Sequence, residues 1–296
     1  MPARLDILKT YKLFVNGQFP RSESGRSEAI LGAAGAVIGH SSKASRKDLR
    51  DAIIAARAGM TKWKGATAYN RGQVLYRMAE MLEARRGEFA ELLALDPRRA
   101  GAATSEAVSM TPDDEVTLSV DRLVAFAGWA DKFTQVLGNQ NAVAGPYWNI
   151  TVPEATGVIV IAPPTRPALL GLVTGLAPVI VAGNGAVVLS DAFAPVVSVF
   201  GEVCATSDLP AGVVNLLTGA LDELLPVAAK HRDVDGMLLL DQPAALNQTA
   251  MEGAADNLKR VRVRAVADYT DRAELEGPWT IEAFVEFKTA WHPVGA

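Results

Sequence analysis

Apolar positions near the start of the chain first alternate and then recur at helical spacing. Residues 13–19 alternate about an Asn-Gly pair, which predicts a β-hairpin. Ser45 lies three residues before Asp48, the spacing of a capping box, and a helix is expected from there to about Trp63. The chain is therefore expected to begin with a hairpin and a helix.

Two more helices are predicted before residue 130. The second is indicated by one apolar stripe and should end near Pro97. The stripe has the spacing i, i+1, i+4, i+7 and i+8 and consists of Val74, Leu75, Met78, Met81 and Leu82. The third helix should start around Pro112 and carries one apolar face formed by Val116, Val120, Leu123, Val124 and Ala127.

From Gly157 onward, short apolar runs alternate with helical segments. The expected strands are 157–161, 186–189, 213–217, 237–240 and 261–266. The expected helices are 167–182, 195–206, 221–230 and 244–257. Strands that are apolar on both faces and separated by helices are typical of buried parallel strands. The predicted fold class is α/β, a doubly wound parallel sheet of about five strands with N-terminal helices.

Two other segments have the two-residue period of a sheet with one solvent-exposed face. Tyr147 to Val152 alternates polar with apolar residues. The segment from Trp279 to Trp291 places its apolar residues on one side, with Phe284 as the exception. We expect the two to pair as a small antiparallel sheet that stands off the main domain. Such a sheet needs something to cover its apolar surface.

Composition narrows the classes of function. Of 296 residues, 49% are hydrophobic and 21% charged, as in an ordinary globular protein. A net charge of -4 offers no basic patch for nucleic acid or an anionic membrane, and no apolar run reaches membrane-spanning length. Residues 1–11 lack the apolar segment of a secretory signal, and the single cysteine excludes an intramolecular disulfide. A cytoplasmic protein with no nucleic-acid or membrane partner is expected.

Several motifs follow one another between about residues 11 and 264. They are Phe14-Val15-Asn16-Gly17, Gly157-Val158-Ile159-Val160-Ile161-Ala162-Pro163, Leu209-Pro210-Ala211-Gly212-Val213-Val214-Asn215-Leu216-Leu217-Thr218-Gly219 and Asn257-Leu258-Lys259-Arg260-Val261. In this order they resemble the front half of an aldehyde dehydrogenase. Ala283-Phe284-Val285-Glu286-Phe287-Lys288-Thr289 resembles that family's C-terminus. In the family, the catalytic domain with its nucleophilic cysteine lies between these two parts, so the resemblance implies that this chain lacks it.

The positions that carry function in the family are altered here. Residues 163–167 read Pro-Pro-Thr-Arg-Pro, without the asparagine that helps to hold the oxyanion. Phe193 stands where the family has the acid that binds the ribose. Asp241 and Pro243 stand in the segment that receives the pyrophosphate, where a carboxylate repels phosphate and proline removes a donor. Residues 262–265 replace the general-base motif. The resemblance therefore implies no catalytic residue, no cofactor-binding residue and no cofactor.

Other reactive side chains have ordinary explanations. Cys204 is a candidate nucleophile, but it falls within a predicted helix, and we interpret it as a buried core residue. The histidines have no metal-ligand spacing, so no metal site is expected. Arg98-Arg99 and the three arginines within 260–264 are interpreted as solvated or interface charges, not as anion sites.

The tryptophans of the small sheet, Trp148, Trp279 and Trp291, are candidates either for an intramolecular core or for a protein interface. We favour the interface, because tryptophan is enriched at interface hot spots and the sheet has no large domain to cover it. The predicted interface residues are Tyr147, Trp148, Ile150, Val152, Phe284, Val285, Phe287 and Trp291. Removal of all residues after Pro278 is expected to leave the α/β domain folded and to abolish association.

The predicted organisation is a degenerate NAD-binding-like domain of residues 1–137 and 153–268 with an oligomerisation arm of residues 138–152 and 279–293. In the family, the arm of one subunit extends the catalytic-domain sheet of its dimer mate. The resemblance therefore implies a pseudoenzyme that assembles with a full-length catalytic aldehyde dehydrogenase subunit as a hetero-oligomer. It is similar in this to the degenerate second unit of family 16 aldehyde dehydrogenases. The alternative is a residual NAD(P)- or aldehyde-binding oxidoreductase component that uses the old cofactor cleft.

Overall fold

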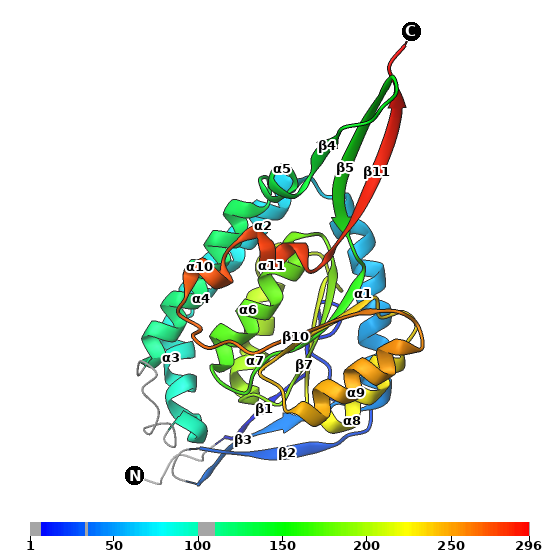
Figure 1. The fold of residues 1–296 in the computed structure, drawn as a ribbon. Coiled ribbons are helices and arrows are strands. Elements are labelled where there is room, and N and C mark those ends of the chain that lie inside the picture. Colours follow the sequence, from blue (N-terminus) through cyan, green and yellow to red (C-terminus); the bar gives the residue numbers. More distant parts are fainter. Residues whose placement is uncertain (1–6, 33–34, 100–109, 296) are drawn as a thin grey trace, which may run out of the picture.

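The apolar runs of the second half form a parallel five-stranded sheet with the strand order β10-β9-β6-β7-β8. The strands are β6 (Val158–Ala162), β7 (Gly185–Ser190), β8 (Val214–Thr218), β9 (Gly236–Leu240) and β10 (Arg260–Arg264). All of them except the edge strand β10 are buried at every residue. This computed structural model describes residues 7–32, 35–99 and 110–295 (Figure 1). Residues 1–6, part of the segment tested for a secretory signal, lie outside the described ranges.

Helices cover both faces of the sheet, which confirms the predicted doubly wound α/β fold. One face packs against α6 (Ala168–Val181) and α7 (Ala194–Ala205), and the other against α1 (Arg46–Gly65), α8 (Leu221–Lys230) and α9 (Ala244–Ala255). Successive side chains of a strand point to opposite faces. Ile159 and Ile161 accordingly belong to one apolar cluster, and Val158 and Val160 to the other.

The N-terminal region adds a layer of helices and a small sheet. The predicted hairpin has a bridge between Val15 and Gln18, and Ser45 and Asp48 form the predicted capping box of α1. The helices that follow are α2 (Ala68–Glu83), α3 (Arg86–Leu95), the short 3-10 helix η1 (Pro97–Arg99), α4 (Pro112–Trp129) and α5 (Phe133–Leu137). The sequence did not predict the sheet of β1 (Lys9–Tyr11), β2 (Ser27–Leu31) and β3 (Val37–Ser42).

The single helix predicted to end near Pro97 is two helices, so that prediction is wrong. The chain leaves helical geometry at Arg85, which has a ψ of 16°. The apolar residues that follow, Phe89, Leu92 and Leu93, are buried in the same core cluster as α2. Periodicity did not show the break because both helices bury an apolar face.

A third sheet projects from the α/β domain as an arm (Figure 1). It contains β4 (Asn139–Asn141), β5 (Tyr147–Ala155) and β11 (Val285–Pro293) in the order β11-β5-β4. β11 runs outward and ends at the tip of the arm (Figure 1). Within the described ranges, no helix combines the length and the apolar character needed to cross a membrane.

The predicted start of the last strand at Trp279 is wrong, because a helix, α11 (Pro278–Glu282), precedes β11. Pro278 and Ile281 are both buried, and a helical turn brings residues three apart to one face. Trp279, between them, points outward and is 66% exposed. Core packing of this turn therefore overrides the alternating pattern.

Candidate functional site

The arm confirms the predicted pairing of its two long strands. β11 runs antiparallel to β5 from Val285 opposite Ala155 to Pro293 opposite Tyr147. β4 covers the other edge of β5 only at residues 149–151. Long strands with so little sheet beside them are marginally stable in water without further packing. The outer part of the arm therefore receives little packing from the described residues of this chain.

The register places the exposed aromatic residues of the arm on both of its faces. Directly opposed residues share a face. Trp148, opposite His292, lies on one face, whereas Trp291, opposite Asn149, lies on the other. Their exposed fractions of 56% and 60% make both side chains part of the surface. The predicted exposed residues thus divide into one group with Trp148, Ile150 and Val152 and another with Tyr147, Phe287 and Trp291.

Polar contacts connect the strands on the face that carries Trp291. Asn141 Nδ2 donates to Asn149 Oδ1 at 2.6 Å and to Thr151 Oγ1 at 2.8 Å. The hydroxyls of Thr151 and Thr289 lie 2.9 Å apart across the next strand pair. The rings of Tyr147 and Trp291 then meet edge to face with centroids 5.8 Å apart. These contacts fix the register of the arm, so its aromatic side chains are presented in one defined arrangement.

The outer edge of β11 is open. Thr156 N donates to Phe284 O and Val294 N donates to Pro146 O, so the even-numbered residues of this segment face β5. The odd-numbered residues must therefore direct their main-chain N–H and C=O groups to the outer edge. These residues are Phe287, Thr289 and Trp291, after Val285 at the root of the arm. Among the described strands, none pairs with this edge.

Two of the predicted interface residues belong to the core of the chain itself. Phe284 and Val285 have exposed fractions of only 3% and 1%. Asn184 Nδ2 donates to Phe284 O at 2.9 Å, and Arg260 Nη1 donates to Val285 O at 2.9 Å. These contacts attach the root of the arm to the α/β domain. Phe284 and Val285 are therefore not available to a partner, because the chain folds its own domain around them.

A cavity of about 380 Å³ lies at the carboxyl ends of β7 and β8. The charged side chains among its described lining residues are Glu28, Asp191 and Asp222, with no lysine or arginine. Burial raises the pKa of Asp191, and the nearby Arg98 opposes part of this shift. Phe193 is buried and offers no acceptor for a ribose hydroxyl. A phosphate would meet carboxylates here, so these residues do not fit a dinucleotide cofactor.

The side chains of Asp241 and Gln242, directly after β9, form hydrogen bonds within the chain. Asp241 Oδ1 accepts from Val266 N at 2.8 Å, and Asp241 Oδ2 accepts from the Tyr269 hydroxyl at 2.6 Å. Burial raises the pKa of Tyr269, and its hydrogen bond to Asp241 raises it further. Gln242 Nε2 donates to Pro163 O at 2.8 Å. The loop where the family receives the pyrophosphate is thus engaged in internal hydrogen bonds.

Residues 265–284, which we call the strap, connect β10 to the arm and include α10 (Arg272–Leu275) and α11. Arg122 on α4 is fully buried and donates to Tyr269 O at 2.8 Å. Its Nε atom also lies 3.6 Å from Glu276 Oε1. Trp129 Nε1 donates to Glu276 O at 2.7 Å. A buried charge is tolerated only with such partners, so the strap is an integrated part of the domain.

We expect Tyr269→Phe to lower the free energy of unfolding by about 1.5–3 kcal/mol, because it removes a hydrogen bond to a carboxylate and leaves Asp241 with one partner fewer. Urea denaturation followed by circular dichroism measures this change. Tyr76→Phe, on the exposed face of α2, is the control and should be neutral. Equal stability of both variants would contradict the anchoring role of Tyr269.

Main-chain N–H groups at the N-terminus of α6 also have a hydrogen-bond partner within the chain. Glu115 is fully buried, and its Oε1 accepts from Leu169 N at 2.9 Å. Its Oε2 lies 2.5 Å from Arg99 Nη1. A carboxylate of the chain itself therefore occupies the position at which a helix N-terminus attracts an anion. The interpretation of Arg99 as a solvated or interface charge is wrong, because its guanidinium pairs with the buried Glu115. Arg98 pairs with the buried Asp96 at 3.1 Å.

Cys204 is buried in α7, which confirms its interpretation as a core residue. Burial raises the pKa of its thiol, so the reactive thiolate is disfavoured. Within the described ranges, no three His, Cys, Asp or Glu side chains are placed to hold a metal ion. The sequence did not indicate the contacts of Arg122 and Asp241, because Arg122 belongs to no motif and the altered motif position of Asp241 does not reveal its partners.

The sequence is similar to those of known aldehyde dehydrogenases. Residues 19–265 match the model of the aldehyde dehydrogenase family. The chain is 29% identical to mouse mitochondrial 10-formyltetrahydrofolate dehydrogenase over 259 residues, which are 85% of this chain and 27% of that protein. It is 32% identical to the human cytosolic 10-formyltetrahydrofolate dehydrogenase over 232 residues, covering 76% and 25%. A putative aldehyde dehydrogenase of Bacillus subtilis is 25% identical over 256 residues, covering 85% and 50%.

Solved structures share the fold. The aldehyde dehydrogenase of Bacillus cereus in its NAD+ complex superposes with a TM-score of 0.77 at 23% identity, covering 87% of this chain and 51% of that one. A 3,6-anhydro-L-galactose dehydrogenase also gives a TM-score of 0.77, at 20% identity and with coverages of 87% and 52%. The chain thus spans about a quarter to a half of the length of the relatives it matches. It belongs to the aldehyde dehydrogenase family.

Proposed function

We propose that this protein is a non-catalytic member of the family that assembles, through its arm, with a full-length catalytic aldehyde dehydrogenase. The observation that carries the proposal is the open outer edge of β11. Phe287, Thr289 and Trp291 direct main-chain donors and acceptors outward, and the tryptophan is mostly exposed. An exposed strand edge is a template for strand addition by another chain, and adjacent aromatic side chains supply binding energy.

The state of the old cofactor groove supports a non-catalytic role. The groove beside β7 and β8 is lined by acidic residues, and Asp241 is engaged by the strap. The strap, which connects β10 to the arm, is fixed to α4 by hydrogen bonds from Arg122 and Trp129. The single thiol of the chain, that of Cys204, is buried within α7. Its pKa is raised, which disfavours the thiolate that attacks an aldehyde. The single cysteine is therefore not placed to form a thiohemiacetal.

We expect the purified protein to show no saturable binding of NAD or NADP at physiological concentrations and no oxidation of aldehydes. The reasons are the acidic side chains of the cavity beside β7 and β8 and the position of Asp241 in the loop where the family receives the pyrophosphate. Isothermal titration calorimetry measures the first expectation and absorbance of the reduced cofactor the second. A micromolar dissociation constant, or turnover that disappears in Cys204→Ser, would favour a residual oxidoreductase instead.

Co-purification tests the assembly itself. The chain is tagged before residue 1, because β1, the first described strand, lies far from the arm (Figure 1). It is isolated from the cells that express it, and the bound proteins are identified by mass spectrometry. We expect a complete aldehyde dehydrogenase in a defined stoichiometry by size-exclusion chromatography with light scattering. A monodisperse monomer with no bound protein would refute the proposal, as would a partner that binds equally well without β11.

A further inference from the structure

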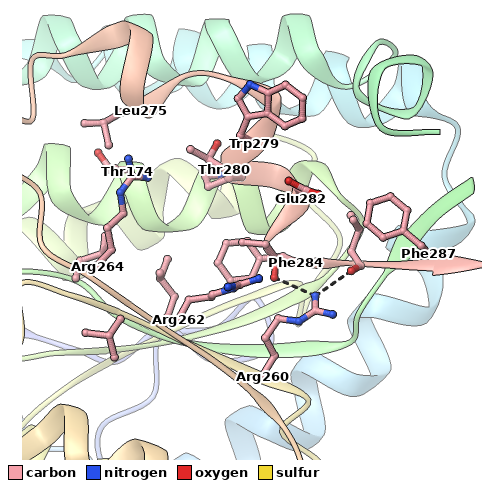
Figure 2. Close-up of a pocket in the computed structure, with 16 residues that line it drawn as sticks. Thr174, Arg260, Arg262, Arg264, Leu275, Trp279, Thr280, Glu282, Phe284 and Phe287 are labelled. Carbon is pink, nitrogen blue, oxygen red and sulfur yellow. Dashed lines mark hydrogen bonds between the residues drawn. The ribbon is translucent and has the colours of Figure 1, made fainter. Parts of the chain in front are cut away.

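A cavity of about 460 Å³ lies between the edge strand β10, the strap and the root of β11. This volume falls within the range of small-molecule sites. Its buried apolar lining includes Leu238, Leu240 and Phe284. The indole of Trp279 and the ring of Phe287, both largely exposed, stand at its sides. The cavity therefore combines an apolar floor with two exposed aromatic side chains at its margin (Figure 2).

Three arginines of β10 line this cavity, and their surroundings differ. Arg260 pairs with Glu286 at 3.0 Å, and Arg264 pairs with Glu274 at 2.6 Å. Arg262, between them, makes neither an ion pair nor a side-chain hydrogen bond with any described residue, and its side chain extends from β10 toward Phe284 (Figure 2). Arg262 is exposed on this edge strand and lines the cavity, so its guanidinium is available to a ligand. A planar guanidinium suits a carboxylate, which it binds through two parallel hydrogen bonds.

We propose that this cavity binds a small monocarboxylate with an apolar body. The carboxylate pairs with Arg262, and the body lies against the apolar floor and the Trp279 ring. The only other unpaired charge among the described lining residues is that of Glu282, which disfavours a ligand with a second negative charge. Every group that lines this site belongs to this chain, so the site does not require the catalytic partner.

Octanoate is a suitable probe, with octan-1-ol and suberate as comparisons. Octanol keeps the apolar chain and lacks the charge, while suberate carries a second carboxylate. We expect saturable binding of octanoate by isothermal titration calorimetry. Affinity should be roughly tenfold weaker for octanol, since a hydrogen-bonded charge contributes about that factor. Suberate should also bind more weakly than octanoate.

Arg262→Met keeps the length of the side chain and removes the charge, so octanoate affinity should fall by about tenfold, while Arg262→Lys should lose less. Arg77→Met on α2 is the matched control and should bind octanoate normally, because Arg77 lies outside the cavity and pairs with Glu80 on its own helix. Circular dichroism establishes that each variant is folded. The proposal is refuted if octanoate shows no saturable binding, or if the Arg262→Met protein binds octanoate as tightly as the unmodified chain.

Discussion

Thr289→Pro should weaken association with the catalytic partner by a factor of about ten to one hundred while the arm itself stays paired. Thr289 is an odd-numbered residue of β11, so its N–H points to the open edge and not to β5. Proline removes that donor, and its ring obstructs an approaching strand, whereas an edge position tolerates it within the sheet. The expected loss corresponds to one unsatisfied main-chain group in the new interface.

Thr289→Val is the matched control, because it keeps the N–H and loses only the hydroxyl that contacts Thr151. Surface plasmon resonance with the co-purified dehydrogenase measures both affinities. Equal binding by the two variants would show that the β11 edge is not the site of strand addition. Trp291→Ala and Trp148→Ala then identify the covered face, since the two residues lie on opposite faces. The substitution on the covered face should cost about 2 kcal/mol.

Phe284→Ala should lower the free energy of unfolding by about 3–5 kcal/mol, while Phe287→Ala should leave it nearly unchanged. The two phenylalanines are three residues apart, and the sequence predicts both as interface residues. Phe284 is 3% exposed and packs in the main core, whereas Phe287 is 46% exposed on the arm. Truncation of Phe284 therefore leaves a cavity, and truncation of Phe287 removes only surface.

Guanidinium denaturation monitored by fluorescence separates the two variants. Phe287→Ala should fold normally and bind the partner less tightly, and Phe284→Ala should lose stability first. If Phe287→Ala proved the more destabilised variant, the conclusion that Phe284 is the core residue at the root of the arm would be wrong.

The burial of Phe284 and Val285 also changes where the chain should be truncated. Removal of residues after Pro278 would take Phe284 and Val285 out of the core, so a cut after Phe287 is the appropriate one.

Sequence patterns were sufficient to predict the parallel sheet and the alternation of strands and helices along the chain. Each central strand is apolar on both faces, and this occurs when helices cover both sides, so the local pattern already contains the global arrangement. The capping box at Ser45 and the pairing of β5 with β11 were also readable, because each depends on a short-range spacing or a strict two-residue period. Motifs spread along the chain were sufficient for the family.

Tertiary packing decided what the local patterns left open. Whether residues 279–284 form a strand or a helix depends on the core pocket that receives Ile281 and Phe284, and alternation alone does not encode that pocket. Tyr269 accepts from Arg122, 147 residues away in sequence, and donates to Asp241, 28 residues away, so no local signal marks these contacts. The assignment of Trp148 and Trp291 to opposite faces follows from the register of two distant strands. Sequence thus determined the elements and the family, and three-dimensional packing determined which side chains remain on the surface, because burial depends on contacts between distant parts of the chain.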